Sequence, residues 1–68
     1  MAYTIRGISY SNLGQDQNAI NDYTKAIQLD PDYAKAYYNR GTSYAKLGQY
    51  TLANADGTMA CSLDSKYC

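Results

Sequence analysis

Apolar side chains recur along this chain at intervals of three and four positions, which is the period of a helix face and not the alternation of a strand. The segment 17–29 shows the pattern most clearly, with one apolar face made of Ala19, Ile20, Tyr23, Ala26 and Ile27. The same period predicts helices over about 2–13, 34–47 and 51–63. We therefore expect four helices and an all-α fold.

Glycine and proline mark the ends of these helices. Gly14 and Gly48 follow the first and third helices, and glycine readily takes the left-handed conformation that ends a helix. The segment Asp30-Pro31-Asp32 separates the second helix from the third. The four helices are thus expected to form two hairpins joined at one break.

The two hairpins are copies of one unit. When the 68-residue chain is shifted by 34 residues, it aligns with itself with 16 identities in 34 pairs. A repeat of this length is typical of solenoid proteins, in which stacked units share a continuous core.

Each copy carries a spaced set of aromatic, glycine and alanine positions. The first copy has Tyr3-x-x-Arg6-Gly7-x-x-Tyr10, Leu13-Gly14, Ala19-x-x-x-Tyr23, Ala26 and Pro31, and the second has Tyr37-x-x-Arg40-Gly41-x-x-Tyr44, Leu47-Gly48, Ala53 and Ala60. This pattern resembles the tetratricopeptide repeat (TPR) over essentially the whole chain. The resemblance implies two antiparallel helix-turn-helix hairpins, repeat 1 at 1–33 and repeat 2 at 34–67, stacked as a short right-handed solenoid.

The fourth helix departs from the pattern of the second. Gly57 replaces the aromatic Tyr23 and Asn54 replaces Ile20, so its apolar face is weaker. Glycine inside a helix costs about 1 kcal/mol relative to alanine. We expect this helix to fray after Gly57.

An arginine and an aspartate recur in both copies at the same offset of 16 residues, Arg6 with Asp22 and Arg40 with Asp56. This offset places the arginine of a first helix beside the aspartate of a second helix, where it can donate two hydrogen bonds to the carboxylate. We expect structural ion pairs that fix the register of each hairpin, with the arginine partly buried. Loss of Asp22 should then cost more stability than loss of Arg6.

Charge and composition exclude several functions. Six Lys and Arg balance six Asp, so the net charge is zero and we expect no nucleic-acid partner. No segment approaches the roughly 20 apolar residues of a membrane span, and the first residues lead directly into the repeat, so we expect a cytoplasmic protein without a membrane partner. The chain has no His, no Glu, no glycine-rich phosphate loop and no nucleophile motif. We therefore expect no catalysis, no cofactor and no metal.

The two cysteines match neither a redox pair nor a zinc site, because Cys61 and Cys68 are seven residues apart and there is no His. If the fourth helix continued to Cys68, the two residues would be about 10 Å apart along it, which is too far for an internal disulfide. We expect Cys61 to be a small core residue; the alternative is intermolecular pairing through Cys68.

Function is then expected from the surface. In the resembled family, the first helices of successive repeats line a concave groove that holds a peptide or a partner helix. The resemblance places in this groove Thr4, Ile5, Ile8, Ser11, Asn12, Lys35, Tyr38, Asn39, Thr42, Ala45 and Lys46. Among these residues Asn39 can grip a peptide backbone, and Lys46 would favour an acidic segment.

We interpret the chain as a non-catalytic module that binds a protein or peptide in this groove. The alternatives are self-assembly as a homodimer, with or without exchange of units about the central turn, and a stable fragment of a longer TPR array. Two repeats make a small core, and we expect a following hairpin to cover the apolar side chains of the fourth helix. The residues expected to mediate self-association are Leu52, Met59, Leu63 and Cys68.

Overall fold

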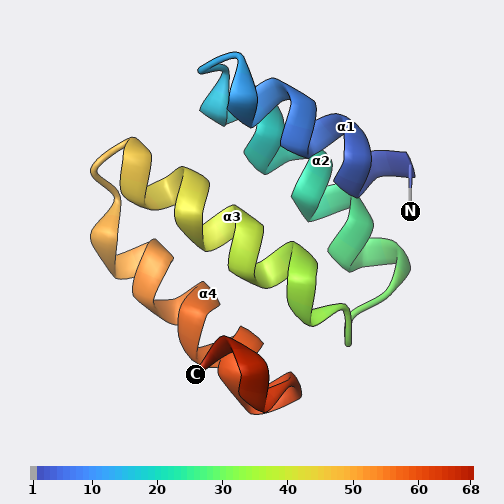
Figure 1. Ribbon diagram of the computed structural model, residues 1–68, viewed down its shortest axis with the longest axis vertical. Coiled ribbons are helices and arrows are strands. Elements are labelled where there is room, and N and C mark those ends of the chain that lie inside the picture. The colour runs from blue at the N-terminus through green and yellow to red at the C-terminus, as the bar shows by residue number, and fades with distance from the viewer. Residues whose placement is uncertain (1) are drawn as a thin grey trace.

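A computed structural model describes residues 2–68, and its elements are α1 (Ala2–Asn12), α2 (Asp16–Leu29), α3 (Ala34–Lys46), α4 (Tyr50–Leu63) and the short 3-10 helix η1 (Ser65–Tyr67). Each helix packs against the next one in the sequence, so α2 lies between α1 and α3 (Figure 1). The chain forms two stacked helical hairpins and measures 28 × 26 × 18 Å. The all-α solenoid expected from the sequence is confirmed.

Glycine ends the first helix of both hairpins. Gly14 and Gly48 have φ angles of 77° and 78°, a left-handed conformation that costs glycine little. In each turn the N–H of the following glutamine donates a 2.9 Å hydrogen bond to the carbonyl five residues earlier, that of Tyr10 or Tyr44. These bonds satisfy carbonyls at the helix end while the chain reverses.

An aspartate shapes the turn after α2, and the same turn recurs after α4. Asp30 Oδ1 accepts a hydrogen bond of 3.2 Å from the backbone N–H two residues later, and Asp64 Oδ1 accepts the equivalent bond at 3.1 Å. Both aspartate carbonyls also accept a 3.1 Å bond from the tyrosine N–H three residues later. Ser65 therefore replaces Pro31 without loss of the turn, because the aspartate side chain supplies its defining hydrogen bond.

The core contains one fully enclosed aromatic ring among small side chains. Tyr23 is 2% exposed, and its ring lies so close to Gly7 that a Cβ atom built there would be 2.6 Å from the ring. Burial raises the pKa of the Tyr23 hydroxyl. The other buried apolar side chains are those of Ala19, Ile20, Ala26, Ala34, Ala36 and Ala60. Helices α1 and α2 can approach this closely only because residue 7 has no side chain.

The expectation that the fourth helix frays after Gly57 is wrong. Helix α4 continues to Leu63, and Ala60 in its last turns is fully buried. Just before the glycine, Arg40 donates two hydrogen bonds of 2.8 Å to Asp56. Contacts on both sides of Gly57 thus offset the helix penalty of about 1 kcal/mol.

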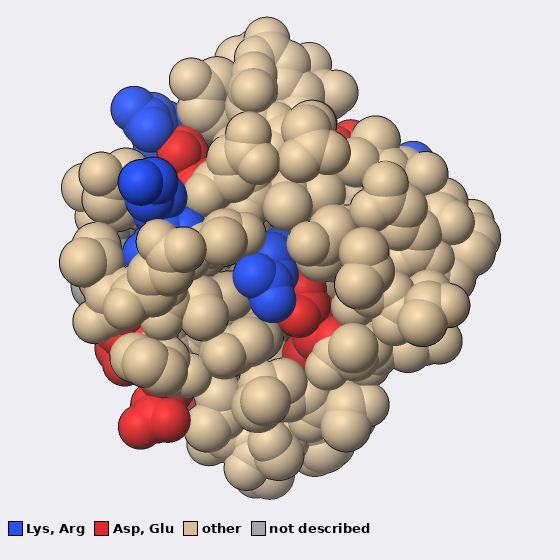
Figure 2. Space-filling view, turned by 180° about the vertical axis from the view of Figure 1, so that it is seen from behind, with Lys and Arg blue, Asp and Glu red and all other residues tan. Residues whose placement is uncertain are grey.

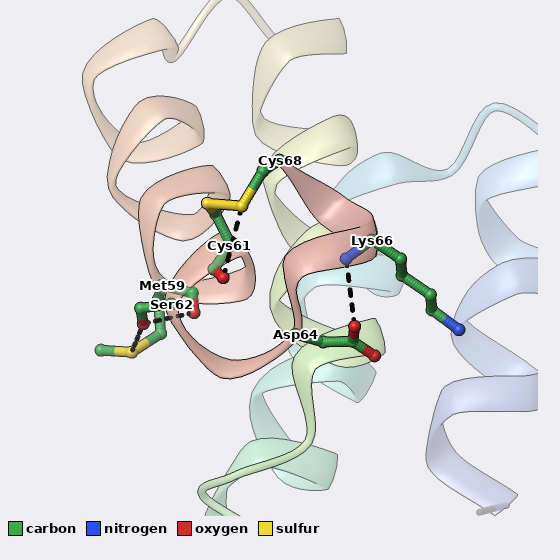
Figure 3. Close-up of a disulfide and its surroundings, with 6 residues drawn as sticks. All are labelled: Met59, Cys61, Ser62, Asp64, Lys66 and Cys68. Carbon is green, nitrogen blue, oxygen red and sulfur yellow. Dashed lines mark hydrogen bonds between the residues drawn. A yellow bond between two sulfur atoms is a disulfide. The ribbon is translucent and has the colours of Figure 1, made fainter.

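The expectation that Cys61 and Cys68 lie too far apart is also wrong, because they form a disulfide within the chain (Figure 3). Helix α4 ends before Cys68 and the chain reverses through η1, so the two Cα atoms are 4.7 Å apart. Cys61 is half-buried and Cys68 is exposed. With both sulfur atoms bonded to each other, Cys68 has no thiol with which to reach a second chain.

Candidate functional site

The expected groove lies along α1 and α3, which are joined near one end by Lys46. Its Nζ donates a 3.0 Å hydrogen bond to Ser11 Oγ of α1 and lies 3.9 Å from Asp16 Oδ1 at the start of α2. The positive charge of Lys46, which we expected to favour an acidic ligand, is therefore partly matched within the chain.

The α1 residues assigned to the groove differ in their access to a ligand. Ile5 is 65% exposed, Asn12 is exposed and Ile8 is half-buried. Thr4 is only 1% exposed, so its placement on the groove surface is wrong. Its short side chain lies inside the molecule, whereas the larger Tyr38 at the equivalent position of repeat 2 reaches the surface.

The α3 side presents aromatic and polar groups. Tyr38 is 46% exposed, and its ring stacks on that of Tyr67 with 4.9 Å between the ring centroids. Thr42 is exposed and donates a 3.1 Å hydrogen bond to the Tyr38 carbonyl. Asn39 is half-buried and Lys35 is exposed. Tyr67 belongs to this surface but was not expected there, and its identity with Tyr33 of repeat 1 was the only signal in the sequence.

A hollow of about 230 Å³ opens beside these residues; its walls are formed by Tyr38, Gly41, Thr42, Ala45, Ala53 and Gly57, and we call it the Gly57 hollow. Helix α3 supplies the first four residues and α4 the last two. Sequence reasoning treated Gly57 only as a weak point of the helix. The loss of the aromatic found at the equivalent Tyr23 was the signal for this space.

Two ion pairs link the helices inside the hairpins. Arg6 donates hydrogen bonds of 2.7 and 2.8 Å to Asp22, and Arg40 donates two of 2.8 Å to Asp56. Both aspartates are 5% exposed, but the side chains of Arg6 and Arg40 are 60% and 18% exposed. The carboxylate is thus the more buried member of each pair, and the partial burial expected of the arginines holds for Arg40 but not for Arg6.

Each guanidinium also lies between two partly exposed tyrosine rings. The rings of Tyr3 and Tyr10 lie beside Arg6, and those of Tyr37 and Tyr44 lie beside Arg40. In all four cases the ring centroid is 5.6 to 5.9 Å from the arginine Cζ. The spacing Tyr-x-x-Arg-x-x-x-Tyr could have predicted this arrangement. Residues three and four apart are neighbours on a helix, and an arginine guanidinium is attracted to aromatic rings.

The ion pairs also set the ionisation of their members. The Arg6 guanidinium, through its hydrogen bonds, holds the pKa of the Asp22 carboxyl below its usual range. Hydrogen bonds to the aspartates raise the pKa of Arg6 and of Arg40 further above their ordinary values. All three groups are therefore charged near neutral pH, which suits them to holding helices together and not to proton transfer.

Uncharged residues cover most of the face shown in Figure 2, where basic side chains gather toward one edge and another basic group lies in the centre against acidic side chains. Within residues 2–68, no group of three or more His, Cys, Asp or Glu side chains is placed to hold a metal ion. None of the helices in that range is long and apolar enough to cross a lipid bilayer.

The side chains assigned to self-association are exposed, Leu52 by 48%, Met59 by 43% and Leu63 by 36%. Their equivalents in repeat 1 are Asn18, Lys25 and Leu29, which stay exposed although α3 packs against α2. A hairpin stacked on α4 as α3 stacks on α2 would therefore leave these three residues uncovered, which corrects our expectation.

Comparison with known proteins agrees with the two-hairpin geometry. A family model described as "TPR repeat" matches residues 7–48, and one described as "Tetratricopeptide repeat" matches residues 34–67. Over 36 residues the chain is 47% identical to human "Tetratricopeptide repeat protein 6", an alignment that covers 53% of this chain and 7% of that protein. The repeated motif, the stacked hairpins and these matches show that the chain belongs to the tetratricopeptide repeat family.

Proposed function

We propose that this chain binds a peptide or partner segment in the groove along α1 and α3. TPR repeats are in general protein–protein interaction modules, and the family is typically a non-catalytic scaffold. The observation that carries the proposal is the exposed pair of Tyr38 and Thr42 on α3, which line the Gly57 hollow. It combines apolar area with hydroxyl groups on rigid helices, as in recognition sites where a few polar groups orient an apolar ligand.

Selection from a random peptide library on the oxidised chain, followed by affinity measurement, tests the groove. We expect Tyr38→Ala and Ile5→Ala to weaken the selected peptides at least tenfold. The matched controls Lys25→Ala and Met59→Ala change exposed residues of α2 and α4 and should leave the affinity unchanged. Equal affinities for all four variants, or losses confined to the controls, would contradict binding in the groove.

Self-association is the second candidate function, and one contact between the units favours it. Arg40 Nη1 donates a 3.2 Å hydrogen bond to Thr24 Oγ1 of the preceding hairpin. The equivalent residues at the two ends of the molecule, Arg6 and Thr58, are both exposed. A second copy that packs its α1 against α4 would reproduce the α2–α3 contact and this hydrogen bond.

Sedimentation velocity over a range of concentrations tests this second candidate. If α1 of one copy packs against α4 of another, Thr58→Arg should shift the chain to the monomer, whereas Thr51→Arg at the exposed start of α4 should not. If the exposed Leu52, Met59 and Leu63 mediate the contact instead, Met59→Lys should be the variant that dissociates it. A wild-type chain that stays monomeric at high concentration excludes both modes.

A further inference from the structure

The two hairpins differ most where repeat 1 has an aromatic ring and repeat 2 has none. In repeat 1 the ring of Tyr23 lies against Gly7, with its Cδ1 and Cε1 atoms 2.9 and 2.6 Å from the place of a Cβ. In repeat 2 the facing glycine is Gly41, and Gly57 stands at the position of Tyr23. A Cβ atom at Gly57 would have no neighbour within 4 Å. The space beside residue 57 is therefore open in repeat 2, although at Gly41 the place of a Cβ lies 3.1 Å from the Ala53 carbonyl oxygen of α4.

The Gly57 hollow has the size and lining that suit an aromatic ring. Its volume is about 230 Å³ and it is open to solvent on one side, so a ring placed in it would be buried in part. Four of its six lining residues are glycine or alanine, whose small size allows a flat ring to approach the backbone. Tyr38 at the rim provides an aromatic neighbour, and paired rings gain from offset or edge-to-face contact.

The hollow also opens where a ligand in the groove would pass. Tyr38 and Thr42, both exposed, belong to the expected groove and to the wall of the hollow. A segment lying along α3 can therefore place one side chain in the hollow over Gly57. Tyr23 shows, within this same chain, which kind of side chain the two-helix geometry accepts.

We propose that the Gly57 hollow is a specificity pocket that takes a single aromatic side chain, Tyr or Phe, from a partner segment bound in the groove. The ring completes the second repeat as Tyr23 completes the first. This inference rests on the proposed groove function, but the hollow can be tested without any partner peptide.

Titration of the ¹⁵N-labelled chain with p-cresol, which is the tyrosine side chain as a free molecule, tests the pocket directly. We expect saturable shifts of the amide signals of Gly41, Thr42 and Gly57. The aliphatic alcohol 1-butanol should bind at least tenfold more weakly. Gly57→Tyr fills the hollow from within and should abolish the p-cresol shifts, whereas Gln28→Tyr adds a ring to an exposed site on α2 and should leave them unchanged.

Several outcomes would contradict the proposed pocket. One is that p-cresol causes no saturable shifts in the wild type, and another is that it causes the same shifts in Gly57→Tyr as in the wild type. Shifts of Gly57 that grow with protein concentration alone would mean that a second copy supplies the ring. If Gly57→Tyr does not fold, Ala45→Phe fills the hollow from α3 and should give the same loss.

Peptides selected on the wild type separate this inference from the groove itself. We expect most of them to carry an aromatic residue and to lose at least tenfold in affinity for Gly57→Tyr. If they bind that variant unchanged but bind Ile5→Ala weakly, the groove function is supported and the pocket is wrong. If Ile5→Ala has no effect and p-cresol still binds, the pocket is supported and the groove function is wrong.

Discussion

The two members of each ion pair are unequally buried, and this difference determines how much stability is lost when one of them is removed. Asp22 is buried while its partner Arg6 is mostly exposed, so Arg6 can turn to water if the carboxylate is removed. The carboxylate cannot do the same if the arginine is removed, and an unpaired buried charge is destabilising. In repeat 2 both members are largely buried, because α2 also contacts Arg40 through Thr24.

The order expected from the sequence should therefore reverse. Arg6→Leu should lower the melting temperature more than Asp22→Leu does, because only the first change leaves a charge buried without a partner. Arg40→Leu should be the most costly, at about 3 kcal/mol, as is found when one partner of a buried pair is lost. Thermal melts of the three variants followed by circular dichroism check this order. A larger loss for Asp22→Leu than for Arg6→Leu would show that the sequence-based expectation was right.

The Asp22 pair should also give the stability a defined dependence on pH. Because Arg6 holds the pKa of the folded Asp22 carboxyl below its usual range, this group stabilises the fold above the unfolded-state pKa of about 4. That contribution is lost as the pH falls through the lower pKa of the folded state. The wild type should thus melt above Asp22→Asn at pH 7, with the difference shrinking below about pH 4. A difference that is constant between pH 7 and pH 2 would contradict this assignment.

At the scale of the elements, the sequence determined most of the helices because their ends depend on local chemistry. Gly14 and Gly48 supply the left-handed turns, and Asp30 closes the turn between the hairpins. The end of α4 was misjudged because Asp64 rebuilds that turn without proline and Arg40 holds the helix through Asp56. Such cross-helix support depends on distance in space, which helix periodicity does not contain.

Restoring the aromatic at position 57 should strengthen α4. Gly57→Ala should raise the free energy of unfolding by about 1 kcal/mol through helix propensity. Gly57→Tyr should raise it by about 2 kcal/mol, because the ring buries apolar area in the Gly57 hollow in addition to removing the glycine. Urea denaturation of the wild type and both variants measures the three values. If Tyr proves less stabilising than Ala, the hollow does not accept the ring in the way that repeat 1 accepts Tyr23.

At the scale of the whole molecule, the repeat determines the stacking, but differences between the copies determine the surface. The 34-residue period and the TPR resemblance sufficed for the solenoid. They placed Thr4 and Tyr38 at one equivalent position, yet the first is buried and the second is exposed. The Gly57 hollow and the Tyr38–Tyr67 stack likewise arise where the copies differ or where the last turn folds back. A pattern shared by both copies cannot predict such features.

The disulfide should stabilise the whole chain through its last turn. It joins residues with a sequence separation of seven, and the entropy that such a loop removes from the unfolded chain corresponds to about 2 kcal/mol. For a domain of this size, reduction should lower the melting temperature by about 10 °C. The Cys61→Ser/Cys68→Ser variant should melt with the reduced wild type and should not respond to reductant. Equal melting of the oxidised and reduced wild type would contradict the stabilisation and would show that the hydrogen bonds of Asp64 hold the turn without the cross-link.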